Sequence, residues 1–172
     1  MEIYEIKLHE VLWGSVLVAL TMAIHGTGMF AVLQVTDRLK ERFAPMESFF
    51  GGLGVVILAS VMILVVNTLE VMMWTIFLFL KGVQVNHSTA FYNAMLNYTT
   101  LSAGYLPSHW RLLEPLLGMA GLLTVAWSTG ILLVLAQDFQ ETQLRKRKSR
   151  REAQGKITRR PERAGAAEKL RD

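Results

Sequence analysis

The chain has 172 residues, 52% of them hydrophobic, and a net charge of +4; without cysteine it has no disulfides and no thiolate metal ligands. Its apolar residues form three long blocks with little or no charge, and not the alternating polar and apolar faces that enclose a soluble core. Each block supplies the roughly 20 apolar residues that a transmembrane helix needs. The composition therefore predicts an all-α membrane protein with three transmembrane helices.

The first apolar block runs from Trp13 to Val35 and carries no charge. Residues 1–10 are net acidic, whereas a cleavable secretory leader starts with basic residues and has a shorter apolar stretch. We therefore expect residues 1–47 to be a retained transmembrane helix followed by a basic cytoplasmic link. The basic residues of this link are Arg38, Lys40 and Arg42.

Two ionisable side chains lie inside the apolar blocks. Glu70 is the one charge in the second block, residues 51–80, and shares a helical face with Asn67 and Trp74. A carboxyl at membrane depth is costly, so that face either supports a functional element or holds a protonated Glu70 in a local hydrogen bond. His25, in the first block, is a candidate pH sensor, although a neutral histidine at a helix contact is the simpler interpretation.

The distribution of Lys and Arg predicts the orientation, because basic residues near membrane ends favour the cytoplasm. Most of these residues fall in the link after the first block and in residues 145–172, after the third. Both regions can be cytoplasmic only if two crossings separate them. We expect the N-terminus outside, the link inside, the region between the second and third blocks outside and the C-terminus inside.

A short helix is expected over residues 88–100, between the second and third blocks. Ser88 is a plausible N-cap, and apolar residues then recur at intervals of three and four. About three turns, near 20 Å, cannot cross a bilayer. The segment is interpreted either as a re-entrant helix that dips into the membrane and returns through an extended segment or as an ordinary extracellular amphipathic helix.

The third block is predicted to be an inner helix over residues 112–144. Small and weakly polar residues give way to leucines along one of its faces, which suits a wet cavity above an apolar gate. The alternative is that the small residues only permit close helix packing. The residues of this face are Gly121, Thr124, Ser128, Leu132 and Leu135.

Residues 145–172 are strongly basic and poor in large apolar residues, so we expect a disordered cytoplasmic tail. Its position beside a membrane end favours contact with anionic lipids. Nucleic acid is not an expected partner, because no aromatic residues interleave with the charges.

Several short motifs then indicate a family. They are Phe91-Tyr92, Asn97-Tyr98-Thr99-Thr100, Trp110-Arg111-Leu112-Leu113-Glu114-Pro115-Leu116 and Ala126-Trp127-Ser128-Thr129. In order and spacing they resemble the pore module of the bacterial ion-channel-2 type potassium channels, the two-transmembrane relatives of the tandem-pore channels. The resemblance implies a pore module over residues 48–144, with outer helix 51–80, pore helix 88–100, filter loop 99–105 and inner helix 112–144.

The resemblance also implies the site, the assembly and the location. Four loops with rings of backbone carbonyls make such a filter, so a homo-oligomer, a tetramer in this family, is expected in a bacterial inner membrane. The implied filter residues are Thr99, Thr100, Leu101, Ser102, Ala103 and Gly104, supported from behind by Glu70, Trp74, Asn97, Tyr98 and Tyr105.

The filter departs from the family pattern at three positions. Ser102 stands where the family has its first glycine, Ala103 where it has tyrosine and Tyr105 where it has aspartate. A residue with a Cβ costs roughly 1–2 kcal/mol in the left-handed conformation that glycine adopts freely. We therefore expect weakly selective conduction of monovalent cations such as potassium and sodium. The alternative is a channel-derived membrane protein that does not conduct and that assembles with or regulates another membrane component.

Other functional classes lack a signature. The sequence has no phosphate-cradling glycine motif and no nucleophile–base pair, and its four histidines have no shared metal-ligand spacing. The chain is therefore not expected to be an enzyme, to hold a cofactor or to bind a structural metal. His87 and His109 flank the expected outer mouth, where zinc or proton block is conceivable.

Overall fold

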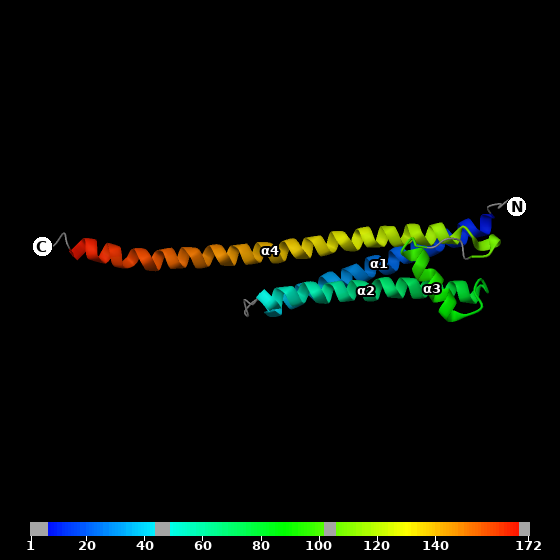
Figure 1. Ribbon diagram of the computed structural model, residues 1–172, viewed down its shortest axis with the longest axis horizontal. Coiled ribbons are helices and arrows are strands. Elements are labelled where there is room, and N and C mark those ends of the chain that lie inside the picture. Colours follow the sequence, from blue (N-terminus) through cyan, green and yellow to red (C-terminus); the bar gives the residue numbers. More distant parts are fainter. Residues whose placement is uncertain (1–6, 44–48, 102–105, 169–172) are drawn as a thin grey trace. The chain divides into compact units, whose positions relative to one another are not determined.

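The computed structural model describes residues 7–43, 49–101 and 106–168, and throughout these ranges the secondary structure is helical, without strands (Figure 1). The elements in chain order are α1 (Leu8–Phe43), α2 (Phe49–Leu80), α3 (His87–Tyr98), a 3₁₀ turn at Ser108–Trp110, and α4 (Leu113–Glu168). Helices α1, α2 and α4 are each long and apolar enough to cross a membrane. The expected all-α class with three membrane-length helices is confirmed.

The chain divides into two units, Met1–Leu133 and Val134–Asp172. In the first unit, α1 and α2 run antiparallel, because successive contacts pair rising residue numbers on α1 with falling numbers on α2. Thr21 receives a hydrogen bond from Trp74, and one turn later His25 pairs with Glu70.

Helix α4 runs parallel to α1 within the first unit. Glu10 Oε2 accepts a hydrogen bond from the backbone N–H of Leu112, and Ser128 lies against His25 further along both helices. Three consecutive crossings would give this arrangement, with α1 and α4 in one direction and α2 in the other.

Helix α3 is a short element of 12 residues. Its N-cap is Asn86, whose side chain accepts a hydrogen bond from the N–H of Ser88 at 2.9 Å. The prediction that Ser88 caps this helix is wrong, because the helix begins at His87 and the asparagine has the extended backbone of a cap residue. The helix ends at Tyr98, two residues before the predicted end.

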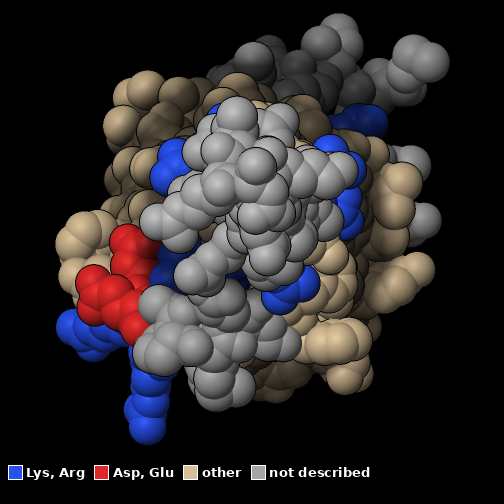
Figure 2. Space-filling model, turned by 90° about the vertical axis from the view of Figure 1, so that its left-hand side faces the viewer, with Lys and Arg blue, Asp and Glu red and all other residues tan. Residues whose placement is uncertain are grey.

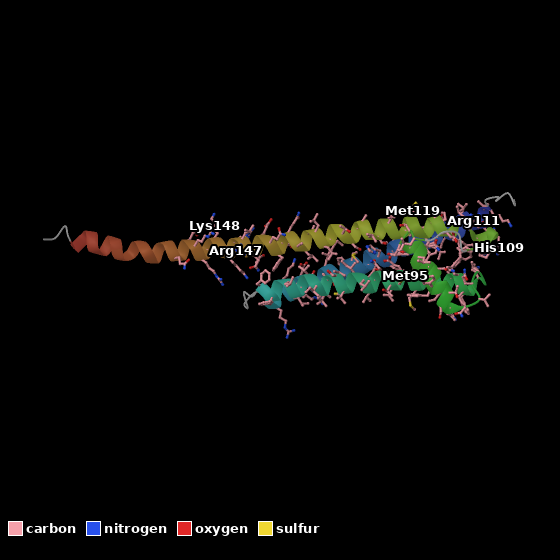
Figure 3. The ribbon with its side chains drawn as sticks, viewed as in Figure 1. Met95, His109, Arg111, Met119, Arg147 and Lys148 are labelled. Carbon is pink, nitrogen blue, oxygen red and sulfur yellow. The ribbon has the colours of Figure 1, made fainter. Side chains whose placement is uncertain are left out.

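The second unit continues α4 as far as Glu168, so the structure differs here from the expected inner-helix end at residue 144 and disordered tail. The composition argument concerned the inability to form a core, and a single charged helix needs none. Helix-favouring residues and pairs such as Glu141–Arg145, at 3.6 Å, act locally. Arg147 and Lys148 belong to this exposed basic stretch (Figure 3).

The buried core of the first unit lies where α1, α2, α3 and the start of α4 meet. It includes Leu17, Val71, Trp74, Leu78, Val83, Tyr98, Leu106, Trp110, Leu113 and Leu117. Elsewhere the long helices expose large apolar side chains to the surroundings, which is the composition expected of surfaces that face lipid or other chains. Figure 2 views the end of the molecule that lies at the left of Figure 1 and shows Lys and Arg side chains and a group of Asp and Glu side chains among uncharged residues.

Candidate functional site

The candidate site is centred on Tyr98, the last residue of α3. Its hydroxyl lies 2.6 Å from Glu70 Oε2 on α2 and 2.5 Å from Thr124 Oγ1 on α4. Tyr98 is buried, and both of its partners are fully buried. Hydrogen bonds therefore fasten the end of the short helix to the last third of α2 and to the third and fourth turns of α4, in a buried environment where such bonds are electrostatically strong.

Two glycines of α4 let α3 approach this closely. A Cβ at Gly121 would lie 2.9 Å from the carbonyl carbon of Tyr98, and a Cβ at Gly118 would lie 3.3 Å from the carbonyl oxygen of Asn97. The neighbouring atoms are backbone and cannot rotate away. The lack of a side chain at these two glycines therefore permits the close α3–α4 contact.

The hydrogen bonds continue from Glu70 into α1. His25 Nδ1 lies 2.8 Å from Glu70 Oε1, and His25 Nε2 lies 3.3 Å from Ser128 Oγ on α4. At the other end, the Thr124 hydroxyl donates to the carbonyl of Gly121 at 2.9 Å. We call the five side chains that make these contacts the buried polar chain: Ser128, His25, Glu70, Tyr98 and Thr124.

The expected filter supports behave in different ways. Trp74 is fully buried, but its indole N–H donates to Thr21 Oγ1 at 2.9 Å, which ties α2 to α1. Asn97 is buried and its amide donates back to the carbonyl of Asn93 in its own helix. Glu70 and Tyr98 contact each other, and Tyr105 lies outside the described residues.

At the start of the expected filter, just after α3, one residue has a left-handed backbone conformation. Thr100 has φ of +61°, which is uncommon for a residue other than glycine and unfavourable for a β-branched one. Its backbone N–H still donates to the carbonyl of Asn97 at 2.9 Å, and Leu101 N–H donates to Leu96 at 2.8 Å. The side chains of Thr99, Thr100 and Leu101 are exposed in the single chain. The other expected filter residues, Ser102, Ala103 and Gly104, lie outside the described residues.

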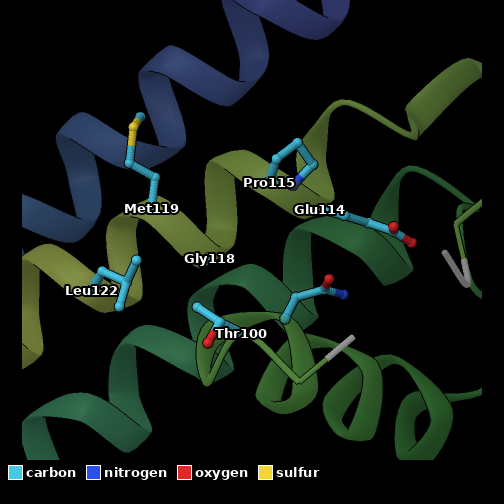
Figure 4. Close-up of a pocket in the computed structure, with 7 residues that line it drawn as sticks. Thr100, Glu114, Pro115, Gly118, Met119 and Leu122 are labelled. Atoms are coloured by element: carbon cyan, nitrogen blue, oxygen red, sulfur yellow. The ribbon is translucent and has the colours of Figure 1, made fainter. Parts of the chain in front are cut away.

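A pocket of about 400 Å³ lies beside Thr100, between the end of α3 and the first turns of α4 (Figure 4). Its lining is Asn97, Thr100, Glu114, Pro115, Gly118, Met119 and Leu122. Met119 and Leu122 are exposed there, so this side of α4 presents apolar side chains next to the threonine. The Glu114 carboxylate accepts a hydrogen bond from the N–H of Leu106 at 2.6 Å and so holds the returning chain against α4.

The structure differs from expectation for the face of α4 that was assigned to a cavity and gate. Gly121, Thr124 and Ser128 are buried against α1 and α3, so they contact protein and not open space. Leu132 is half-buried, and Leu135, in the second unit, is buried. The face that adjoins Thr100 is the one with Met119 and Leu122.

His25 is the site residue that the sequence underrated. Its own position carries no sign of a partner, but polar residues spaced by four occur on both helices, Thr21 and His25 on α1, Glu70 and Trp74 on α2. In an antiparallel pair, two such spacings can match in register, as these do. That coincidence was the available signal.

Among the described residues, no group of three or more His, Asp or Glu side chains is placed to hold a metal ion. Comparison of the chain with protein-family models, with curated proteins and with solved structures finds no match. Its function is therefore argued from the geometry of the site.

Proposed function

We propose that this protein is one subunit of a cation channel, similar to potassium channels, in which α3 is a re-entrant pore helix and residues 99–105 form the filter. Four copies surround the ion path, each contributing one loop. The filter passes monovalent cations such as potassium and sodium with weak discrimination.

The distance of Tyr98 from the nearby ends of α2 and α4 is the observation that carries this proposal. Its partners Glu70 and Thr124 lie about ten residues from the end of α2 and from the start of α4, or about 15 Å at 1.5 Å per residue. With these helix ends at one edge of the membrane, that distance is about half of a hydrocarbon core roughly 30 Å thick. In the proposed arrangement the chain enters from the end of α2, reaches this depth in α3, and returns to the same side to begin α4. An amphipathic helix lying on the surface has no reason to bury its last residue there.

Backbone at such a depth is tolerated only where protein or water surrounds it. The exposed threonines at the end of α3, and the left-handed turn at Thr100, supply a threonine hydroxyl and an irregular backbone beside an open pocket. The carboxyl end of a helix also carries partial negative charge, which favours a cation in front of it. These features suit an ion path better than a lipid contact.

The exposed apolar side of α4 supports assembly from several copies. Met119 and Leu122 lie next to the pocket with large apolar surface that the single chain leaves uncovered. In a tetramer this side meets the neighbouring subunit and the path below the filter. A single loop cannot by itself surround an ion with carbonyls.

Aromatic side chains support a membrane–water interface near the start of α1, the end of α2 and the start of α4. His9, Trp13, Phe77 and Trp110 form a contiguous set of rings there, with centroid separations of 5.2 to 5.8 Å between neighbours. The Lys81 ammonium lies 4.2 Å from the centre of a Trp13 ring. Tryptophan and lysine of this kind mark membrane–water interfaces. His109 and Arg111, labelled in Figure 3, belong to the same connecting region.

The test is ion flux through the purified full-length protein in liposomes, with reversal potentials measured in potassium and sodium gradients. We expect cation flux with little preference between the two ions. Thr100→Lys should abolish it, because four ammonium groups at the filter repel cations. Thr142→Lys, which adds the same charge at an exposed position of the second unit, is the matched control and should conduct normally.

A chain in which Ser102 and Ala103 are replaced by Gly and Tyr gives the reference filter and should become potassium-selective. Strong potassium preference in the unmodified chain would refute weak selectivity. No flux in either the unmodified or the Gly-Tyr chain would refute the channel and favour a membrane protein that regulates another component.

A further inference from the structure

The number of hydrogens that the buried polar chain can supply can be compared with the number of its contacts. Its heavy atoms make five contacts: Thr124 to the Gly121 carbonyl, Thr124 to Tyr98, Tyr98 to Glu70, Glu70 to His25, and His25 to Ser128. Each contact needs one hydrogen between its two atoms. The available hydrogens are fixed by the chemistry of each side chain.

A neutral arrangement satisfies every contact. The Thr124 hydroxyl donates its one hydrogen to the carbonyl of Gly121, so its oxygen must accept a hydrogen bond from the Tyr98 hydroxyl. In this arrangement the phenol oxygen accepts from a protonated Glu70 carboxyl, whereas with an ionised carboxylate the phenol is the donor of the same 2.6 Å contact. The other carboxyl oxygen accepts from His25 Nδ1–H.

The contact between His25 and Ser128 also carries a hydrogen in this arrangement. His25 Nε2, with its lone pair, accepts from the hydroxyl of Ser128. All five contacts then carry a hydrogen and no member is charged.

An ionised pair, with Glu70 as a carboxylate and His25 as an imidazolium, satisfies fewer of these contacts. If the Glu70 proton moves to His25, Tyr98 must donate to the carboxylate, and Thr124 is left with one hydrogen for two contacts. One of the five contacts then goes without a hydrogen, and two charges lie in a fully buried, apolar setting.

We propose that Glu70 is held as a neutral acid by this closed set of hydrogen bonds, and that His25, acting through Glu70, is a positioning residue for Tyr98 at the entrance to the filter. The ionisable members come from three helices, His25 from α1, Glu70 from α2 and Tyr98 from α3, while α4 contributes hydroxyls. The first helix is thus part of the support of the pore helix. The protonation state stands without the channel; the role toward a filter rests on the proposed function.

Infrared spectroscopy of the unmodified protein in liposomes tests the protonation state directly. A neutral carboxyl has a carbonyl stretching band that a carboxylate lacks and that shifts in D₂O. We expect such a band at neutral pH in the unmodified chain and its loss in Glu70→Gln. Absence of a band that depends on Glu70 would overturn the neutral acid.

Nuclear magnetic resonance of the same full-length protein, with tyrosine labelled with ¹³C at Cζ, tests the positioning. The Tyr98 signal is assigned by its loss in Tyr98→Phe. Glutamine has the hydrogen-bond pattern of a protonated glutamic acid, so Glu70→Gln should leave the signal in place, whereas Glu70→Leu should move it.

For the first helix, His25→Leu should move the Tyr98 signal, and His25→Gln, which can donate to Glu70 and accept from Ser128, should restore most of it. Thr27→Val is the matched control, because this exposed hydroxyl bonds only to carbonyls of its own helix, Ala23 and Ile24. A Tyr98 signal that is the same in His25→Leu as in the unmodified chain would overturn the positioning role. These readouts need no ion flux, so a chain that fails to conduct while meeting both refutes the channel and not the neutral acid.

Discussion

Replacing Gly121 with alanine tests whether α3 is wedged against α4. An added methyl group would overlap the carbonyl oxygen of Tyr98 and lie 2.9 Å from its carbonyl carbon and 3.2 Å from its Cα. All three are backbone atoms, so relief requires movement of the whole end of α3. Gly130, on the same helix, is the matched control, because a Cβ there meets nothing within 4 Å.

The magnitude follows from two opposing terms. Alanine is favoured over glycine inside a helix by about 0.8–1.0 kcal/mol, and both variants gain this amount. Overpacking a well-filled contact costs about 1–3 kcal/mol, and only Gly121→Ala incurs it. The free energies of unfolding of the two variants should therefore differ by about 1–3 kcal/mol, with Gly130→Ala the more stable.

Thermal unfolding in detergent measures this difference. For a chain of this length each kcal/mol moves Tm by about 2–4 °C, so Gly121→Ala should melt roughly 2–12 °C below Gly130→Ala. It should also move the ¹³C signal of Tyr98, which Gly130→Ala leaves in place. Equal melting temperatures with an unmoved signal would refute the close approach of α3 to α4.

Two other contacts give predictions of the same kind. A Cβ at Gly28 would lie 2.6 Å from a methyl carbon of Val66, so Gly28→Ala should lower the free energy of unfolding by about 1–3 kcal/mol. Adding Val66→Ala to this variant should recover part of the loss. If the effects of the two substitutions simply add, the contact between α1 and α2 at these residues is refuted. Thr100→Gly should relieve about 1–2 kcal/mol of left-handed backbone cost and so melt higher than Thr99→Gly, whose residue has φ of −87°; the reverse order would show that the Thr100 side chain outweighs its backbone.

The existence of the helices could be predicted from the sequence. A run of apolar residues without charge has few alternatives to a membrane-length helix, and the three runs appear as α1, α2 and α4. The short α3 was also predictable, although its cap was assigned two residues late, because Asn86 and Ser88 are both good cap residues and only the backbone conformation separates them. The helical tail was missed because its stability is local and leaves no apolar pattern.

The sequence did not predict which side of each helix packs against protein and which side faces lipid. A helix that is apolar all round has no periodicity to say which side meets protein and which meets lipid, since both are equally apolar. The stripe Gly121, Thr124 and Ser128 therefore suited a cavity as well as a packed contact, and its burial follows from the approach of α1 and α3.

By itself, then, the sequence determined that there are three membrane-length helices, that a short helix lies between the second and the third, and where the charges fall. Only the tertiary structure joined His25 to Glu70 and Glu70 to Tyr98, because these residues are far apart in the chain and their hydrogen bonds depend on the register between helices. A polar side chain inside an apolar helix indicates that a partner exists. Which partner it has depends on the packing of backbones, and here two glycines of α4 allow that packing.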